Sequence, residues 1–518
     1  MFPQVLKASI VCFCAGLLFP ALALSQDGLT VKTESGRLAG ALTEDGKVAL
    51  YLGVPFAAPP VGELRWKEPQ PMVPWTGVRA AKEFGSHCMQ AAAYADMIFR
   101  DPGESEDCLT VNVWAPVKSK KLPVMVWIHG GGYQAGGSSE SRQDGQYLAH
   151  RGVIVVTMNY RLGIWGFMVH PELTAESPHH ASGNYGLMDQ WAALAWVKKN
   201  IEAFGGDPGN VTLFGESAGS FSVNTQMASP LSQGLFQKAI GESGGALYGS
   251  NEIARMRSER EEADSAYAQK AFVTSKLADL RKLTANRMKA AVMSKETPAR
   301  FGPDVDGYFL TDTVANIYKE GKQAHVPLIA GWNTDEGGTH ARVNAATYQA
   351  FATKEFPGRE KEFMTLYPGG RDITALNSGN AYAADKFIAY STWRWLEGQV
   401  QTGGKPVYRY HFELGSPGDK YHPANAGAFH SDEINYVFGT LALRPEAVWR
   451  PVDWLLSEKM GEYWTNFAKT GNPNGDGLAK WPVYNPESWT VMHLSESSTS
   501  TPDEFRARYL FLDSVWGR

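Results

Sequence analysis

The chain has 518 residues, of which 43% are hydrophobic and 20% charged, the composition of a soluble globular protein that can bury a large core. Its formal net charge of −5 excludes the basic footprint of a nucleic-acid-binding protein, so we expect no nucleic-acid partner. The 16 Trp and 21 Tyr residues favour an enzyme with an aromatic-walled pocket.

Residues 1–25 are predicted to be a secretory signal peptide. Lys7 supplies a positive n-region, Ala8–Phe19 form an apolar h-region, and small residues offer cleavage sites that end at Ala23 or Ser25. A membrane anchor is the alternative, but the apolar run is short and a proline interrupts it. We therefore expect export to the periplasm or the medium, with no stable membrane insertion after the signal is cleaved.

The cysteine content agrees with export. Cys12 and Cys14 lie in the expected signal and would leave with it, so the mature chain keeps Cys88 and Cys108. In an oxidising compartment this even pair would close a loop of about 20 residues, worth on the order of 3 kcal/mol. Two buried free thiols are the alternative, and the residues alone leave both open.

Residues 26–518 are expected to form a single catalytic domain with insertions. Residues 29–52 alternate in short runs around an Asp-Gly turn signal, which predicts a small antiparallel sheet at the start. Apolar runs at 122–128 and 152–158 predict strands buried on both faces, as in a parallel sheet. Between residues 187 and 201, apolar side chains recur every three or four positions, which predicts a helix.

The second half of the chain continues the alternation. Residues 251–295 are charged with helical periodicity, which predicts surface helices. Strand patterns return at 325–331 and 406–414. Strands that alternate with helices indicate an α/β fold, with a mostly parallel, doubly wound sheet and helices on both of its faces.

Residues 210–220, NVTLFGESAGS, carry the strongest chemical signal. An apolar strand pattern leads into Gly-Glu-Ser-Ala-Gly, which matches the G-x-S-x-G nucleophile elbow, a sharp strand-to-helix turn that exposes the Ser217 hydroxyl. Gly215 and Gly219 lack a β-carbon and let neighbouring backbone approach the turn. The alternative is an ordinary glycine-containing turn, because motifs of small residues recur by chance.

A nucleophilic serine needs a base, and the base needs an acid that orients it. His430 is the candidate base, because a glycine-started run of small residues leads into it after an expected strand. Glu336 is the candidate acid, since it also follows an expected strand, and functional residues gather at the carboxyl ends of such strands. Asp335 and Asp306 are competing acids, and the residues alone do not choose among the three.

A glycine loop, His129 to Tyr133 (HGGGY), follows the predicted 122–128 strand. An α/β-hydrolase places backbone N–H donors for an oxyanion at this point, each worth about 3 kcal/mol in the transition state. A flexible glycine loop is the alternative, while a phosphate-binding loop is excluded because the Lys-Ser/Thr pair is missing. Nothing in the sequence requires a metal or a cofactor, so we expect none.

Together these motifs resemble those of the type B carboxylesterases, the family that includes the cholinesterases. The resemblance covers nearly all of the chain from about Val31 onward. The residues that carry it are Phe56-Ala57-Ala58-Pro59-Pro60 with Gly62 and Arg65, Glu106-Asp107-Cys108-Leu109 with Asn112, His129 to Tyr133, Asn159-Tyr160-Arg161, Asn184 to Asp189, the GESAG motif, Asp335-Glu336-Gly337, and Phe429-His430 with Glu433 and Phe438-Gly439.

The resemblance implies an α/β-hydrolase fold with Ser217 as nucleophile, Glu336 as acid and His430 as base. It selects Glu336 over the competing aspartates. Ser243 matches a family serine that supports the acid, although a purely structural hydrogen bond is the plainer interpretation of this residue.

The resemblance also implies an oxyanion hole made by the backbone N–H groups of Gly131, Gly132 and Ala218, and a Cys88–Cys108 disulfide. The longer eukaryotic members carry further disulfides, for which this chain has no cysteines left. The choline-binding features of those members are therefore not implied.

The sequence thus predicts an exported serine carboxylesterase that hydrolyses a small-molecule ester through an acyl-enzyme. Tyr133 and Trp165 are candidate walls of its pocket. One alternative is the same triad acting on amides, carbamates or acyl transfer. Another is a non-catalytic binding protein on the same fold, which is disfavoured because all three triad residues are present.

Overall fold

The computed structural model describes residues 29–91, 94–249, 252–253, 255–337, 343–422 and 427–517. The expected signal peptide, residues 1–25, lies outside the described residues. Within the described ranges, no helix combines the length and the apolar character needed to cross a bilayer.

A large sheet of 11 strands, in the order β16-β15-β14-β13-β12-β11-β9-β10-β8-β4-β3, organises the described chain. These strands are β3 (Ala41–Leu42), β4 (Val48–Pro55), β8 (Thr110–Pro116), β9 (Leu122–Ile128), β10 (Ile154–Met158), β11 (Gly206–Glu216), β12 (Lys238–Glu242), β13 (Leu328–Asn333), β14 (Val407–Phe412), β15 (Thr490–Leu494) and β16 (Thr499–Pro502). Neighbouring strands from β15 to β10 pair in parallel, and antiparallel pairs lie only toward the two edges. The predicted mostly parallel sheet is confirmed.

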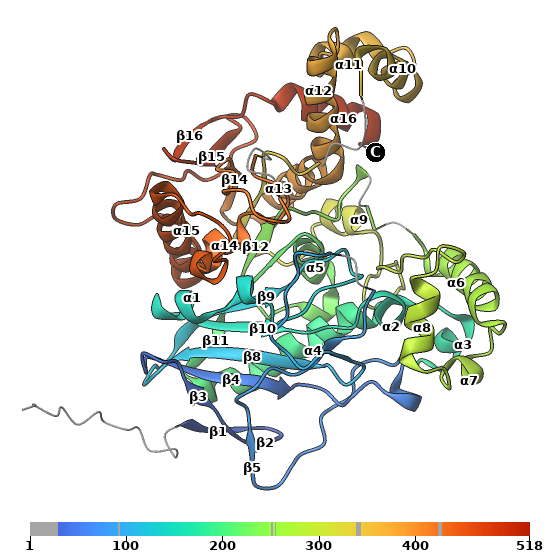
Figure 1. Ribbon diagram of the computed structural model, residues 1–518, viewed down its shortest axis with the longest axis vertical. Helices are drawn as coiled ribbons and strands as arrows, with labels where there is room; N and C mark the ends of the chain where they lie inside the picture. Colours follow the sequence, from blue (N-terminus) through green and yellow to red (C-terminus); the bar gives the residue numbers. More distant parts are fainter. Residues whose placement is uncertain are drawn as a thin grey trace, which may run out of the picture.

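Helices cover both faces of this sheet (Figure 1). With the helices that lie beyond the sheet included, the described chain has α1 (Gln146–His150), α2 (Gly163–Phe167), α3 (Pro171–Glu176), α4 (Tyr185–Asn200), α5 (Ala218–Ala228), α6 (Arg257–Phe272), α7 (Leu277–Leu280), α8 (Ala285–Val292), α9 (Val314–Lys319), α10 (Ala345–Glu355), α11 (Glu360–Leu366), α12 (Asp372–Ala384), α13 (Tyr390–Gly403), α14 (Ile434–Phe438), α15 (Pro451–Thr470) and α16 (Arg506–Trp516).

The β9 sequence shows why both faces are covered. Val124 and Val126 point into a core shared with α4, α5 and α13, whereas Met125 and Trp127 point into a second core shared with α1, α14 and α15. Successive side chains of a strand alternate between faces, so a continuous apolar run can only be buried between two helical layers.

The N-terminal sheet differs in part from the prediction. β1 (Thr30–Thr33) and β2 (Gly36–Ala39) pair antiparallel as expected, but β5 (Val78–Ala80) adds to β2 in parallel, so this sheet is mixed. The expected 29–52 sheet also lacks β3 and β4, because both join the central sheet. Six of the eight β4 residues are buried, and only the central sheet offers cover on both sides.

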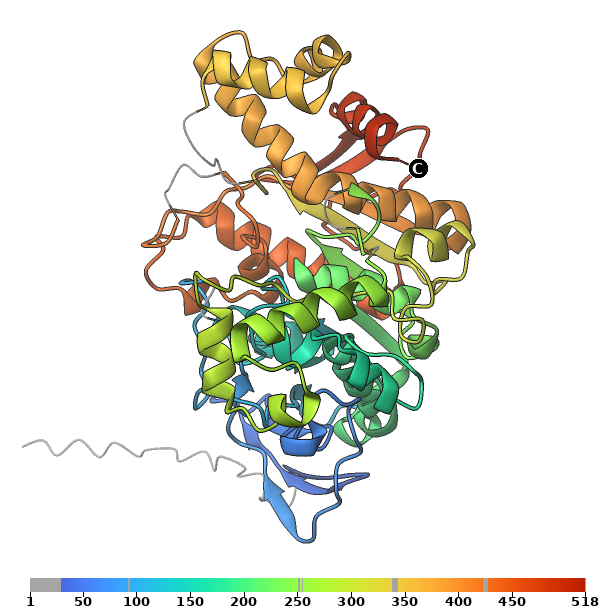
Figure 2. The same ribbon diagram turned by 90° about the vertical axis from the view of Figure 1, so that its right-hand side faces the viewer.

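Peripheral elements extend the molecule along its longest axis. The β1–β2–β5 sheet lies at one end, and α10, α11 and α12 lie at the other end in both views (Figures 1 and 2). Helices α6, α7 and α8 fall within the 251–295 segment that periodicity predicted to be helical. They form a separate layer beside α2 and α3 (Figure 1).

Candidate active site

Ser217 occupies a strained turn between β11 and α5. Its φ of 54° and ψ of −122° lie outside the regions that ordinary residues populate. A β-carbon on Gly215 would lie 2.6 Å from the Ile128 carbonyl oxygen, and one on Gly219 would lie 2.0 Å from the same atom. Both glycines are therefore required where β9 crosses the turn, and the bend leaves the Ser217 side chain at the carboxyl end of the sheet.

Three predicted residues meet at this end of the sheet. His430 Nε2 lies 2.8 Å from Ser217 Oγ, and His430 Nδ1 lies 2.5 Å from Glu336 Oε2. The second carboxylate oxygen of Glu336 accepts hydrogen bonds from the Ser243 hydroxyl at 2.5 Å and from the Asn333 backbone N–H at 2.7 Å. The arrangement can pass a proton from the hydroxyl to the imidazole while the buried carboxylate fixes the orientation of the ring.

The two competing aspartates lie apart from His430. The Asp335 carboxylate accepts a hydrogen bond from the Thr334 hydroxyl at 3.0 Å, while its backbone N–H donates to the Ala428 carbonyl at 2.9 Å. Asp335 thus ties the His430 loop to β13 through the main chain. Asp306 instead accepts two backbone N–H groups in its own loop, from Tyr308 and Leu310.

The glycine loop packs directly against the Ser217 turn. A β-carbon on Gly130 would lie 3.1 Å from the Ser217 β-carbon, so this loop approaches closer than other residues would allow. Gly131 and Gly132 adopt φ values of 107° and 61°, which favour glycine. Both residues line the same pocket as Ser217 and Ala218, in a position to direct backbone donors at a group bound to the serine.

Two buried carboxyls beside the imidazole were not among the predicted site residues. Glu216 Oε1 lies 3.3 Å from His430 Nε2, and Glu433 accepts a 2.6 Å hydrogen bond from the Asn333 side-chain amide. Burial raises the pKa of Glu216 to about 8 and that of Glu433 to about 7. Burial also acts to lower the pKa of His430, but the carboxyls of Glu216 and Glu336 outweigh it, so the net shift is upward.

The elbow and the histidine open into a pocket of about 480 Å³. Besides the residues already named, it is lined by Tyr94, Asp96, Met97, Tyr133, Arg142, Phe221, Ile253, Arg300, Phe387, His422 and Ser431. Tyr133 is a wall, as predicted, whereas Trp165 is not: it lines a separate small cavity together with Cys88 and Cys108. The prediction for Trp165 is therefore wrong, because its helix α2 is fully buried behind the glycine loop.

Cys88 and Cys108 form a disulfide, with α-carbons 5.1 Å apart. Cys88 ends β6 (His87–Cys88), which pairs with β7 (Glu104–Ser105), so the bond closes a loop between neighbouring segments. Met97, which lines the pocket, lies on this loop. The disulfide therefore fixes the base of a segment that contributes to the pocket wall.

Comparison with known proteins agrees with this geometry. Residues 27–511 match the model of the carboxylesterase family. The chain is 35% identical to a fumonisin B1 esterase from Sphingopyxis macrogoltabida, over 90% of this chain and 86% of that protein. It is also 35% identical to a para-nitrobenzyl esterase from Bacillus subtilis, over 93% and 98% of the two chains. A solved structure of PNB esterase superposes with a TM-score of 0.80 at 33% identity, covering 93% of this chain and 99% of that one. The chain therefore belongs to the carboxylesterase family and is a carboxylic ester hydrolase.

Proposed function

We propose that Ser217, His430 and Glu336 are the catalytic triad of this esterase. The observation that carries the proposal is the continuous chain of contacts from Ser217 Oγ to His430 Nε2 and from His430 Nδ1 to Glu336. His430 accepts the hydroxyl proton as Ser217 Oγ bonds to the ester carbonyl carbon. Glu336 stabilises the imidazolium that forms and keeps it in the productive tautomer.

The rest of the catalytic cycle uses the triad together with backbone donors and a water molecule. The backbone N–H groups of Gly131, Gly132 and Ala218 bind the oxyanion of the tetrahedral intermediate. When this intermediate collapses, the imidazolium returns its proton to the departing alcohol oxygen, and the acyl group stays on Ser217. A water molecule then gives a proton to His430 as its oxygen bonds to the acyl carbon. When this second tetrahedral intermediate collapses, the imidazolium returns the proton to Ser217 Oγ and the acid is released.

Turnover of matched substrates tests this function. Wild type should hydrolyse an ester faster than the amide with the same acyl group and faster than the carbamate with the same alcohol. Ser217→Ala should lower kcat on the ester by roughly six orders of magnitude, as when the nucleophile of a serine protease is removed. Binding without turnover in wild type would favour the non-catalytic alternative. Faster cleavage of the amide or the carbamate, or transfer of the acyl group to an added alcohol in preference to water, would favour the alternative in which the same triad carries out that reaction.

We also propose that the protein is exported after cleavage of residues 1–25. The N-terminal charge and hydropathy pattern supports this, as does the Cys88–Cys108 disulfide, since such bonds persist in oxidising compartments. Protein recovered from the periplasm or the medium should begin near Leu24 or Gln26 and take up no thiol-alkylating reagent without reduction. An intact N-terminus, or two alkylated cysteines, would contradict the proposal.

A further inference from the structure

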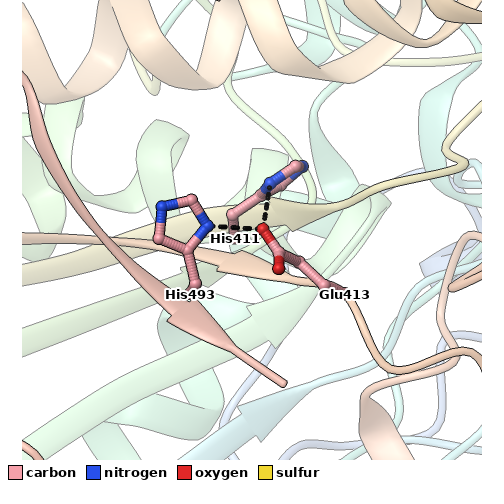
Figure 3. A group of neighbouring side chains, drawn as sticks. All are labelled: His411, Glu413 and His493. Carbon is pink, nitrogen blue, oxygen red and sulfur yellow. Dashed lines mark hydrogen bonds and ion pairs between the residues drawn. The ribbon is translucent and has the colours of Figure 1, made fainter. Parts of the chain in front are cut away.

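Three side chains of the types that ligate metals lie close together outside the active-site pocket. His411 Nδ1 lies 3.2 Å from Glu413 Oε1, and His493 Nδ1 lies 2.5 Å from the same oxygen. All three ligand atoms lie within 4.8 Å of one another. Figure 3 shows both imidazole rings directed at the one carboxylate. None of these residues takes part in the proposed ester hydrolysis or lines its pocket.

The strand register brings the three together. His411 belongs to β14 and His493 to β15, and the two are direct partners in this parallel pair. Glu413 follows β14 two residues after His411, so its side chain projects from the same face. Its backbone N–H donates to the Leu494 carbonyl at 2.9 Å, which continues the pairing past the end of β14. The three donors are thus held on paired backbone rather than on a free loop.

Two imidazole nitrogens and a carboxylate oxygen are the donor set that binds Zn²⁺ and similar divalent transition metals. Ligand atoms of a tetrahedral zinc ion lie about 3.3 Å apart, given metal–ligand distances of about 2.0–2.2 Å. The His411–Glu413 separation of 3.2 Å already matches this spacing. The His493–Glu413 contact of 2.5 Å needs to open by less than about 1 Å, which a rotation of one side chain supplies.

The surroundings also suit a metal ligand. His493 Nε2, the nitrogen that points away from Glu413, lies 2.8 Å from the Thr501 hydroxyl on β16. Metal-bound histidines usually engage a partner through the second ring nitrogen, which fixes the ring and its tautomer. The three side chains are 14%, 29% and 22% exposed, so an ion and a completing water molecule can reach them.

We propose that His411, Glu413 and His493 form a binding site for one divalent transition-metal ion of the Zn²⁺ type, which clamps β14 to β15. The site has no part in ester chemistry; its role is to hold two parallel strands that are far apart in the sequence. Magnesium and calcium are not expected to bind, because they prefer sites built from oxygen ligands.

Metal-binding measurements on tag-free protein test the proposal. We expect equilibrium dialysis to give one Zn²⁺ per chain, and the melting temperature to rise with Zn²⁺ concentration because the ion binds only the folded state. Co²⁺ at the same site should show the visible absorption of tetrahedral coordination. Both His493→Ala and the near-isosteric Glu413→Gln should weaken the zinc affinity by more than about tenfold, since even outer-shell partners are worth that much. Circular dichroism establishes that the variants are folded.

Two matched variants locate the ion. His150→Ala removes a histidine that faces a single carboxylate, Asp45, at 3.2 Å, and it should bind zinc as wild type does. His430→Ala removes the active-site imidazole and should also bind zinc with the affinity of wild type. The proposal is overturned if wild type binds no zinc, if His493→Ala and Glu413→Gln bind it unchanged, or if His430→Ala alone abolishes binding. In each of those cases the cluster is a hydrogen-bonded His–Glu–His group only, and the proposed esterase function is unaffected.

Discussion

The Oε1 atom of Glu216 lies 3.3 Å from His430 Nε2, the same nitrogen that meets Ser217 Oγ at 2.8 Å. A full negative charge at Glu216 would hold His430 as an imidazolium, which cannot accept the serine proton. Burial raises the pKa of Glu216, whereas the charge of a protonated His430 acts to lower it, so the two groups titrate together. The residue before the nucleophile therefore influences the base without taking part in the proton transfer.

Replacing Glu216 should alter the pH dependence more than the maximal rate. The carboxyl raises the pKa of His430, and only neutral His430 acts as a base, so kcat/KM rises as pH passes through the pKa of His430. Glu216→Gln lowers that pKa and should move the acid limb of the profile to lower pH, with kcat within about tenfold of wild type. Glu242→Gln is the control, because Glu242 pairs with Glu216 in the strand register but bonds to Trp464. An acid limb that does not move in Glu216→Gln would contradict this account.

The adjacent side chains of Asp335 and Glu336 point toward different partners. Glu336 meets His430 Nδ1, whereas Asp335 turns to Thr334. Glu336→Gln should therefore cut kcat by about four orders of magnitude, as for the acid of a serine protease, with little change in substrate binding. Asp335→Asn should keep a substantial fraction of the activity. Steady-state kinetics on both variants, with circular dichroism as the folding check, shows which residue is the catalytic acid. If Glu336→Gln keeps its activity and Asp335→Asn loses it, the acid is Asp335.

The glycine loop should be sensitive to a single methyl group. A β-carbon on Gly131 would lie 2.0 Å from the Ala135 carbonyl oxygen, so Gly131→Ala must displace the backbone donor at that position. Loss of one oxyanion donor costs about two to three orders of magnitude in kcat. Gly46→Ala is the control, because Gly46 also has a left-handed φ but nothing within 4 Å of the added atom. Equal activity of the two variants would exclude Gly131 from the oxyanion hole.

The pocket should distinguish charged from neutral acyl groups through Arg300. This side chain is exposed in the pocket beside Gly132, and among the described residues it has no acidic partner. We expect Arg300→Ala to lower kcat/KM about fivefold for an ester whose acyl chain carries a free carboxylate, because an exposed ion pair is worth up to about 1 kcal/mol. The methylated form of the same substrate should be unaffected. Equal losses on both substrates would mean that Arg300 only shapes the pocket.

The sequence predicts those elements whose structure depends on residues that are close together in the chain. The apolar run of β9 and the glycines around Ser217 admit few other structures, so both were predictable from the sequence. The membership of β4 in the central sheet was not, because pairing with β8 depends on a partner about 60 residues away. The choice of Glu336 over Asp335 came from family resemblance, since adjacent carboxylates differ only in the direction set by the end of β13.

The buried carboxyl groups near the active site were also not predicted from the sequence. Glu216 and Glu433 both lie in matched motifs, yet sequence reasoning places such residues at the surface, because carboxylates are rarely buried without a partner. The His411–Glu413–His493 cluster could not be predicted from the sequence either. It forms only when β14 and β15, some 80 residues apart, pair in one particular register.

Covalent labelling with a fluorophosphonate tests whether Ser217 is the nucleophile. Wild type treated with a fluorophosphonate should gain the mass of one phosphonyl group per chain, and peptide mapping should place it on Ser217. His430→Ala should label far more slowly, because the hydroxyl then lacks its base, and Ser217→Ala should not label. Labelling of Ser217→Ala at a rate comparable to wild type would show that another residue is the nucleophile.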